Sequence, residues 1–438
     1  MLAALFVVCG LAVPGTLAAD TLRLATSETI ARAISGGPEI LRQRVRVERA
    51  HAERRAIGGF LPALPELELE GASDAPFKAE GEREWGVGLS QEIEIGGQYF
   101  LRRAAADAAV AQAELETRAV ELELRARARV LHARLAAAQD QVRLIGELAA
   151  FARRLDTIAA RMLDVGEISE LDRNTVGIGA AGAEIELVQA RAELAEARTE
   201  LHRLLGVPAG TIVVAMEPEF PSSSAAIASV LDTVNQVEAA LAAGDDRFIR
   251  ERPDWQALEQ GLERYRAERR LAGRWAVPNL HLGVGVTGER RSLESSDGHS
   301  HGTAAFSEHM LLGVRLGMQI PIPGVAASGQ GNMAVADAEI AALEADRRAL
   351  MAGVGADLQS AASRLRGAAA ALALCNERIV PMLERNRELV ERGYAAGELT
   401  ATQTVTQQEQ LLRSSEALVR ARREYAEAFA EFERIIGR

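Results

Sequence analysis

Three histidines stand close enough together in the sequence to suggest a metal site. His299, His301 and His309 lie in a stretch rich in serine and glycine, which we expect to form the loop of a strand hairpin. Imidazoles at this spacing on a loop can hold a transition metal weakly. A solvated loop explains the same residues without a ligand, so the sequence predicts no resident metal.

Motifs of catalytic chemistry are absent from the sequence. There is no nucleophile elbow, glycine-rich phosphate loop, His-Glu-x-x-His or paired-cysteine metal motif. The formal net charge of −12 and the pI near 5.3 argue against a nucleic-acid binder. We therefore expect no enzyme, no cofactor and no nucleic-acid partner.

Charged residues alternate with apolar ones in several short stretches. This period of two predicts strands with one polar and one apolar face. The expected apolar face carries Leu67, Leu69, Val87, Leu89, Ile93 and Ile95. The expected polar face carries Glu66, Glu68, Glu70, Glu92 and Glu94, with Arg315 from the second half of the chain. If this face lined a channel, its carboxylates would favour cations; alternatively, they only keep a wet wall soluble.

A short turn motif occurs twice in the chain. Its first copy consists of Arg161, Gly166, Glu167 and Ser169, and its second copy of Arg392, Gly397, Glu398 and Thr400. Each glycine fits the left-handed position that ends a helix, and Ser169 and Thr400 fit the N-cap of the next helix. Turn formation explains these residues but not the glutamate that follows each glycine.

The turn motif is part of a larger duplication. Pro38-Glu39-Ile40 and Leu204-Leu205-Gly206 correspond to Pro253-Asp254-Trp255 and Ile435-Ile436-Gly437. A repeat of about half the chain predicts two similar blocks packed side by side. We assign residues 20–206 to repeat 1, 207–250 to a connector with a short helix, and 251–438 to repeat 2.

Residues 1–19 have the pattern of a secretory signal peptide. An apolar stretch from Leu2 to Val13 precedes small residues and then Asp20. Lipoprotein processing at Cys9 is the alternative. Beyond this segment no run of 18 or more apolar residues occurs, so no helix is expected to span a bilayer.

Each repeat is expected to form a helix, two strands, a long helix, a turn and a helix. The predicted helices span 27–58, 97–163 and 169–205, then 252–273, 328–394 and 400–436. Pro381 interrupts the second long helix and predicts a kink. Each strand, at about 9–11 residues, has the length of a tilted transmembrane strand, although a soluble sheet with one buried face would alternate in the same way.

Four amphipathic strands leave two edges of a sheet open. In a bilayer these edges cannot stay unpaired, so such a sheet must close with other copies of the chain. Two, three or four chains would give 8, 12 or 16 strands.

The ordered set of features resembles the TolC-like outer-membrane factors of tripartite efflux and type I secretion systems. The resemblance rests on the duplication, on the two Gly-Glu turns, and on Gly37-Pro38-Glu39 and Arg252-Pro253-Asp254, which open the repeats. It implies a mainly α fold with a small β part. It also implies a homotrimer in the outer membrane, with a 12-stranded β-barrel and a coiled-coil α-helical barrel in the periplasm.

The resemblance also implies partners and a function. A periplasmic adaptor would contact the tips at Gly166 and Gly397, and an inner-membrane pump, of the RND type, would complete the system. The short turns look closest to those of the cobalt–zinc–cadmium subtype of cation efflux components. The resemblance thus implies a passive exit duct for metal cations or small toxic molecules. A type I protein-secretion channel and a periplasmic coiled-coil adaptor or scaffold remain as alternatives. An adaptor has one helical hairpin between β domains, whereas two are predicted here.

Overall fold

The computed structural model describes residues 21–58, 61, 63–73, 82–208, 210–216, 224–293, 305–318 and 329–437. The predicted signal peptide lies outside these ranges. The chain divides into two compact units, which we call the helical unit and the sheet unit. The helical unit comprises Met1–Gln43, Arg118–Arg252 and Met351–Arg438; the sheet unit comprises Arg44–Thr117 and Pro253–Leu350.

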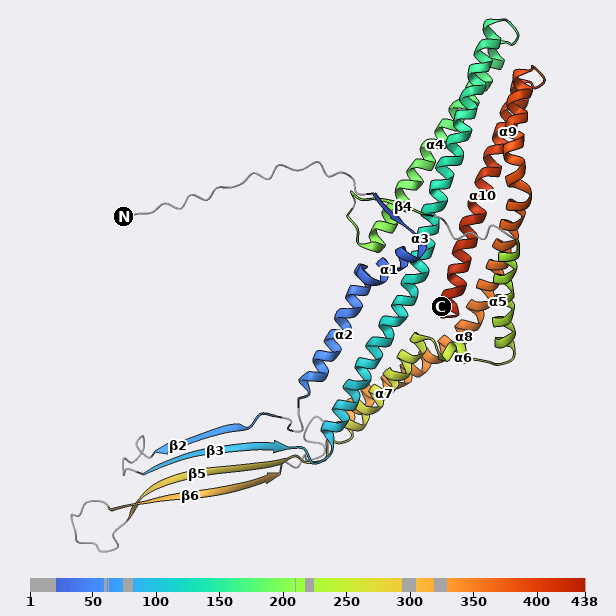
Figure 1. Cartoon of the computed structure of the whole chain (residues 1–438). Coiled ribbons are helices and arrows are strands. Elements are labelled where there is room, and N and C mark those ends of the chain that lie inside the picture. Colours follow the sequence, from blue (N-terminus) through green and yellow to red (C-terminus); the bar gives the residue numbers. More distant parts are fainter. Residues whose placement is uncertain are drawn as a thin grey trace, which may run out of the picture. The chain divides into compact units, whose positions relative to one another are not determined.

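Both halves follow the order of elements predicted from the sequence (Figure 1). The first contains β1 (Thr21–Leu24), α1 (Thr26–Gly36), α2 (Pro38–Ala56), β2 (Glu66–Ser73), β3 (Arg83–Ile93), α3 (Gln98–Asp164) and α4 (Glu170–Leu205). Between the halves lie β4 (Ile212–Ala215), α5 (Ser224–Ala242) and α6 (Arg247–Arg250). The second contains α7 (Pro253–Ala272), β5 (Leu280–Leu293), β6 (Ala305–Met318), α8 (Gly329–Leu374), η1 (Cys375–Ile379), α9 (Val380–Ala395) and α10 (Ala401–Ile435). The mainly helical class with a small β part is confirmed.

The structure corrects the prediction of one continuous first helix. Gly37 separates α1 from α2 with an extended backbone, at φ −60° and ψ 142°. Pro38 explains the break, because a proline ring disfavours helical geometry at the residue before it. The connector also differs from the expected short helix. It contains β4, which pairs in parallel with β1, and the 19-residue helix α5.

The predicted kink at Pro381 takes the form of a π-helical turn. Val380 N–H donates to the carbonyl of Cys375, five residues back, within η1. Proline has no N–H, and its ring would collide with the carbonyl four residues back in a regular helix. The wider turn just before Pro381 accommodates both effects. Repeat 1 has no such break, since α3 runs as one helix of 67 residues.

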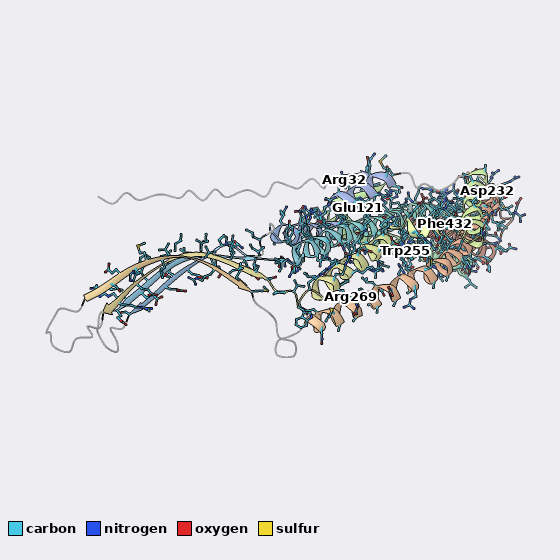
Figure 2. The ribbon with its side chains drawn as sticks, turned by 90° about the horizontal axis from the view of Figure 1, so that it is seen from below. Arg32, Glu121, Asp232, Trp255, Arg269 and Phe432 are labelled. Atoms are coloured by element: carbon cyan, nitrogen blue, oxygen red, sulfur yellow. The ribbon has the colours of Figure 1, made fainter. Side chains whose placement is uncertain are left out.

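The sheet unit contains a four-stranded antiparallel sheet in the order β2-β3-β5-β6. The two hairpins meet through β3 and β5, so β2 and β6 form the edges. The strands have 8, 11, 14 and 14 residues, and the last two exceed the expected length. Figure 2 shows that the sheet is bent along its strands and carries side chains on both faces.

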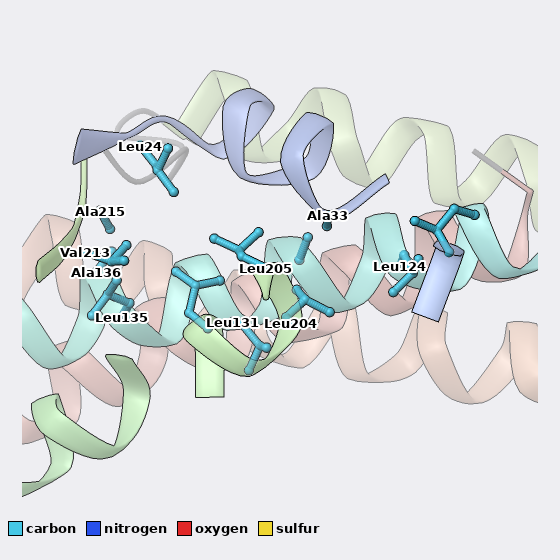
Figure 3. Close-up of a cluster of buried hydrophobic side chains, with 13 residues drawn as sticks. Leu24, Ala33, Leu124, Leu131, Leu135, Ala136, Leu204, Leu205, Val213 and Ala215 are labelled. Atoms are coloured by element: carbon cyan, nitrogen blue, oxygen red, sulfur yellow. The ribbon is translucent and has the colours of Figure 1, made fainter. Parts of the chain in front are cut away.

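Within the helical unit, a cluster of buried side chains joins β1 and α1 to α3 and α4 (Figure 3). Leu24 and Ala33 pack against Leu131 and Leu135 of α3 and Leu204 of α4. Buried His132 lies next to this cluster, where its two ring nitrogens lie 3.2 Å from Thr26 Oγ1 and 3.0 Å from the Leu24 carbonyl. These contacts hold β1 and α1 against the long helix.

Candidate functional sites: the hairpin tips and the two faces of the sheet

The turn after α3 satisfies its backbone through a Schellman motif. Gly166 adopts φ +81°, and its N–H donates to the Leu163 carbonyl at 3.0 Å. The N–H of Glu167 donates to the Met162 carbonyl at 2.8 Å. Only glycine takes up this left-handed conformation without steric cost, which explains its place in the sequence.

The turn after α9 has the same geometry. Gly397 adopts φ +74° and donates to Tyr394, and Glu398 N–H donates to the Gly393 carbonyl at 2.9 Å. Capping boxes then start α4 and α10. Asp172 N–H donates to Ser169 Oγ at 3.1 Å, and Gln403 N–H donates to Thr400 Oγ1 at 3.3 Å. The repeated sequence motif therefore encodes one turn, built twice.

Buried side chains hold the α3–α4 hairpin against the α9–α10 hairpin below these turns. Figure 1 shows the two hairpins side by side, with their turns at the same end. Phe151 and Leu155 pack with Val390 and Tyr394 in one cluster. Burial raises the pKa of the Tyr394 hydroxyl, and the nearby carboxylates of Asp172 and Asp156 raise it further. The two tips thus form one composite surface.

Ion pairs and one close backbone approach extend this contact along the helices. Arg154 bonds Glu391 at 3.2 Å, and Arg387 bonds Glu147 at 3.2 Å. Gly179 of α4 faces Val405 of α10, so closely that a Cβ on the glycine would lie 3.1 Å from Val405 Cγ2. No pattern in the sequence marks Gly179, because only the pairing of α4 with α10 gives this glycine a role.

Several tip side chains have no bonding partner within the described residues. Arg161, Glu167 and Glu398 are exposed, and none of them makes a hydrogen bond or ion pair there. Arg392 bonds Glu388 of its own helix at 2.7 Å, in an exposed pair. The fold therefore explains the glycines and the caps at the tips but gives no reason for the charged side chains.

The register places Glu66, Glu68, Glu70, Glu92 and Arg315 on one face of the sheet, as predicted. Glu68 accepts a hydrogen bond from Ser90 Oγ at 2.8 Å. Arg315 of β6 reaches across two strands to Glu68 at 3.4 Å and Glu70 at 3.6 Å. Its charge therefore lies against two of the carboxylates instead of standing apart from them.

Glycines make the reach of Arg315 possible. Gly88 of β3 and Gly285 of β5 lie between Arg315 and Glu68. A Cβ on either glycine would lie 3.7 Å or 3.6 Å from Arg315 Nη2. We call these two residues the glycine floor. Side chains longer than alanine there would occupy the path of the guanidinium.

Glu94 does not belong to the polar face, which corrects the sequence prediction. It follows the last residue of β3, and only 7% of it is exposed. Both of its oxygens accept hydrogen bonds from Arg102 of α3, at 2.5 and 2.7 Å. Glu94 is therefore the buried partner of a partly exposed arginine, at the point where β3 leads into α3.

The polar face also carries charges that sequence analysis missed. Glu84 and Glu289 face each other across β3 and β5, and Glu289 pairs with Arg291 at 3.1 Å. For Glu84 the available signal was its place next to Trp85, because the two continue the period of two of β3 by one step toward the hairpin.

The histidine cluster receives no support as a unit. His309 lies in β6, opposite Glu289, and not in the loop as predicted. His299 and His301 lie outside the described residues. Within the described part of the chain, no group of three or more His, Cys, Asp or Glu could hold a metal ion.

The other face of the sheet is apolar and exposed. Cross-strand rows of apolar residues include Leu69–Val87–Val286–Leu312 and Leu67–Leu89–Val284–Val314. Leu69 is 71% exposed and Leu312 is 76% exposed. Ile93 ends β3 on this face, whereas Ile95 lies beyond the strand. No helix among the described residues is both long enough and apolar enough to cross a membrane.

The sequence model of the outer membrane efflux protein family matches residues 29–207 and 246–438. The chain belongs to this family. The two matched segments correspond to the two halves of the duplication. A comparison with curated proteins found no match.

Solved structures of outer membrane proteins, two of them outer membrane channels, share the fold of this family member. Vibrio cholerae VceC has a TM-score of 0.67 at 15% identity, covering 94% of this chain and 96% of its own. Campylobacter jejuni CmeC has a TM-score of 0.66 at 15% identity, with 94% and 85% covered. Neisseria gonorrhoeae MtrE, solved in an open state, has a TM-score of 0.62 at 16% identity, with 94% and 88% covered.

Proposed function

We propose that this chain is the outer-membrane channel subunit of a tripartite efflux system. In this proposal three chains close their four-stranded sheets into one 12-stranded barrel, with the helical hairpins in the periplasm. The observation that carries the proposal is the sheet itself, which has one exposed apolar face and two open edges. Family membership and the likeness to solved outer membrane channels support it.

Within the described residues of one chain, the apolar face of the sheet is exposed and neither edge of the sheet is paired. An apolar face this exposed is unfavourable in water by about 25 cal/mol per Å² of apolar surface. The unpaired backbone groups of β2 and β6 cannot remain unpaired in lipid. Pairing β2 of one chain with β6 of the next satisfies both edges, and lipid then covers the apolar face.

The polar face supports a water-filled duct with a preference for cations. It carries Glu66, Glu68, Glu70, Glu84, Glu92 and Glu289 against Arg291 and Arg315. Excess charge of one sign in a confined path concentrates counter-ions. We therefore propose export of metal cations or small basic toxic molecules, as in the cobalt–zinc–cadmium subtype. The duct is passive, and no residue is assigned a catalytic role.

The tips are proposed to dock a periplasmic adaptor, which in turn connects to an inner-membrane pump of the RND type. Their exposed charged side chains support this role, because the fold does not use them. Arg161, Glu167, Arg392 and Glu398 lie at two turns with the same geometry, which suits recognition by a repeated helical partner; of the four, only Arg392 has an ion-pair partner among the described residues, Glu388.

Deletion of the gene tests this function in the native cell. We expect the deletion strain to accumulate cobalt, zinc, cadmium or a basic dye, and plasmid-borne wild type to reverse the effect. The protein should fractionate with outer membranes. Normal accumulation of all these solutes, together with loss of a secreted protein, would instead support the type I secretion function. Recovery of the protein in the soluble periplasmic fraction would support the scaffold.

A further inference from the structure

The helix α4 carries a stripe of apolar side chains that the described part of the chain leaves exposed. Leu171, Ile178, Ile185 and Val188 are each more than half exposed. Their spacings of seven, seven and three residues are those of a coiled-coil seam, so they lie in one line along the helix. Val176, which α4 buries against its own chain, lies two residues from Ile178 and hence on the opposite face. The stripe therefore faces away from the core of its own chain.

A second exposed stripe runs along the end of α8 and along α9. It consists of Leu374, Met382 and Leu389, each more than half exposed. Leu374 and Met382 are eight residues apart, a spacing that would turn them about 80° away from each other in a regular α-helix. The π-helical turn of η1 lies between them, and a π turn contains one residue more than an α-helical turn. The π turn therefore keeps the stripe in line as the helix passes Pro381.

The two stripes match in direction and in level. α4 begins at its turn and α9 ends at its turn, and both turns lie at the same end of the hairpins (Figure 1), so the two helices are antiparallel. Ile178 lies twelve residues from Gly166, and Met382 lies fifteen residues from Gly397. At about 1.5 Å per residue, these levels differ by less than one helical turn. A copy of α9 laid against α4, with the turns at one level, therefore brings the stripes together.

The borders of the two stripes carry opposite charges. Glu170, Glu186 and Glu193 flank the stripe of α4, whereas Arg378 and Arg385 flank the second stripe. None of these five side chains forms a hydrogen bond or an ion pair among the described residues. Exposed ion pairs add little stability, but charges beside a coiled-coil seam select the partner and its orientation. An acidic border on one stripe and a basic border on the other favour pairing of the two stripes with each other.

Within one chain the two stripes lie on different helices at the borders of the helical unit. In the view of Figure 1, α3 and α10 lie between α4 and α9, and α10 contacts both α4 and α9. In a ring of copies, by contrast, α4 of each chain comes next to α9 of its neighbour. A second copy of this chain is therefore the occupant that fits both stripes.

We propose that the α4 stripe of one chain packs on the α8–α9 stripe of the neighbouring copy as an antiparallel coiled-coil seam. The seam rests on the proposed function, because the sheets must first bring the copies side by side around a ring. In the periplasm water would otherwise cover both stripes, which is unfavourable for apolar side chains. The seam adds a contact between copies in the helical unit to the pairing of β2 with β6.

Cysteine crosslinking of the detergent-extracted protein tests the seam with no adaptor present. Ile178→Cys/Met382→Cys would be treated with a short bismaleimide and run on a denaturing gel. A link between chains gives covalent dimers and trimers, whereas a link within one chain leaves a monomer. Ile178→Cys/Glu384→Cys is the matched control, because Glu384 is also exposed but lies two residues from Met382, nearly on the opposite side of α9. Cys375 is buried and stays in both variants.

We expect most of the Ile178→Cys/Met382→Cys protein to shift to covalent trimer and the control to stay mostly monomeric on the gel. Val188→Cys/Leu374→Cys is a second pair along the same seam, so that the test does not depend on the assembly of one variant. Absence of crosslinked trimer from both pairs, in protein that native mass spectrometry shows to be trimeric, would overturn the seam. Equal crosslinking of the control would overturn it as well. A wild-type protein that is monomeric in detergent would instead contradict the proposed function itself.

Discussion

Arg315 shows how a single residue changes the expected electrostatics of the polar face. The sequence presents it as an isolated positive charge among glutamates. In the folded sheet it lies over the glycine floor and pairs with Glu68 and Glu70. Two of the carboxylates are therefore partly compensated, and the remaining excess of negative charge comes from the others.

Replacing Arg315 should strengthen the cation preference of the channel. In Arg315→Gln the carboxylates of Glu68 and Glu70 lose their counter-charge, and we expect the cation-to-anion permeability ratio to rise by roughly twofold, an effect limited by salt screening. The reversal potential in a planar bilayer under a salt gradient measures it. The Glu68→Gln/Arg315→Gln double variant should return toward wild type. A shift toward anions in Arg315→Gln would contradict the assignment of this face to the lumen.

Glu94 and Arg102 give a prediction about stability. Removing Glu94 leaves Arg102, whose side chain is 32% exposed, without its partner, so Glu94→Gln should lower the free energy of unfolding by about 1–3 kcal/mol. Glu66→Gln, at an exposed position of β2, is the control and should have little effect. Thermal unfolding followed by circular dichroism would compare the two. Equal melting temperatures would show that the pair contributes nothing to stability.

The tip glycines give a prediction about docking. Gly166→Val/Gly397→Val should abolish efflux, because a β-branched residue resists the positive φ of both turns, at a cost of about 1–2 kcal/mol each. Barrel assembly should persist, since the turns take no part in the sheet. Drug or metal accumulation and heat-resistant migration of the oligomer would be measured together. Normal efflux in the double variant would refute a docking role for these turns.

For single residues, the sequence predicted the turns at the hairpin tips better than it predicted where the strands of the sheet end. Glycine, serine and threonine act locally, so their turn could be read from spacing alone. Glu94 continues the alternation of Glu92 and Ile93 past the end of the strand, and its partner Arg102 belongs to the following helix. A period of two does not indicate where pairing stops, because the ladder ends only through the tertiary structure.

At the scale of elements, long helices were predicted well and short elements were missed. The apolar period of α3, α4 and α10 repeats over many residues, and capping residues mark the starts of α4 and α10. By contrast, β1 and β4 have only four residues each and pair across most of repeat 1. Such strands show no usable periodicity. Likewise, Pro381 predicted a kink. The sequence did not predict that the kink would be a π-helical turn, because that depends on how the helix packs in the folded chain.

Gly179 provides a test of how α4 packs on α10. Gly179→Val should push against Val405 and disturb the bond from Gln408 Nε2 to the Gly179 carbonyl, at a cost of about 1–3 kcal/mol. Gly182→Val on the same helix is the matched control, since a Cβ there meets open space. Adding Val405→Ala should restore part of the loss. Equal melting temperatures for the two glycine variants would contradict this packing.

At the scale of the whole molecule, one chain is an incomplete structure. Its sheet has an exposed apolar face and two edges that no strand among the described residues pairs. Its helical unit, in contrast, has buried clusters of its own and satisfied turns. We therefore expect assembly to depend on the sheet, with β2 and β6 of neighbouring chains completing each other.

The oligomeric state of the protein extracted from outer membranes tests this account most directly. Native mass spectrometry in detergent should show three chains, because three four-stranded sheets close the barrel that the proposed channel requires. Circular dichroism of the same sample should show that the strands are intact. A stable monomer with its full strand content would contradict the account, since its open edges would then have no need of a partner.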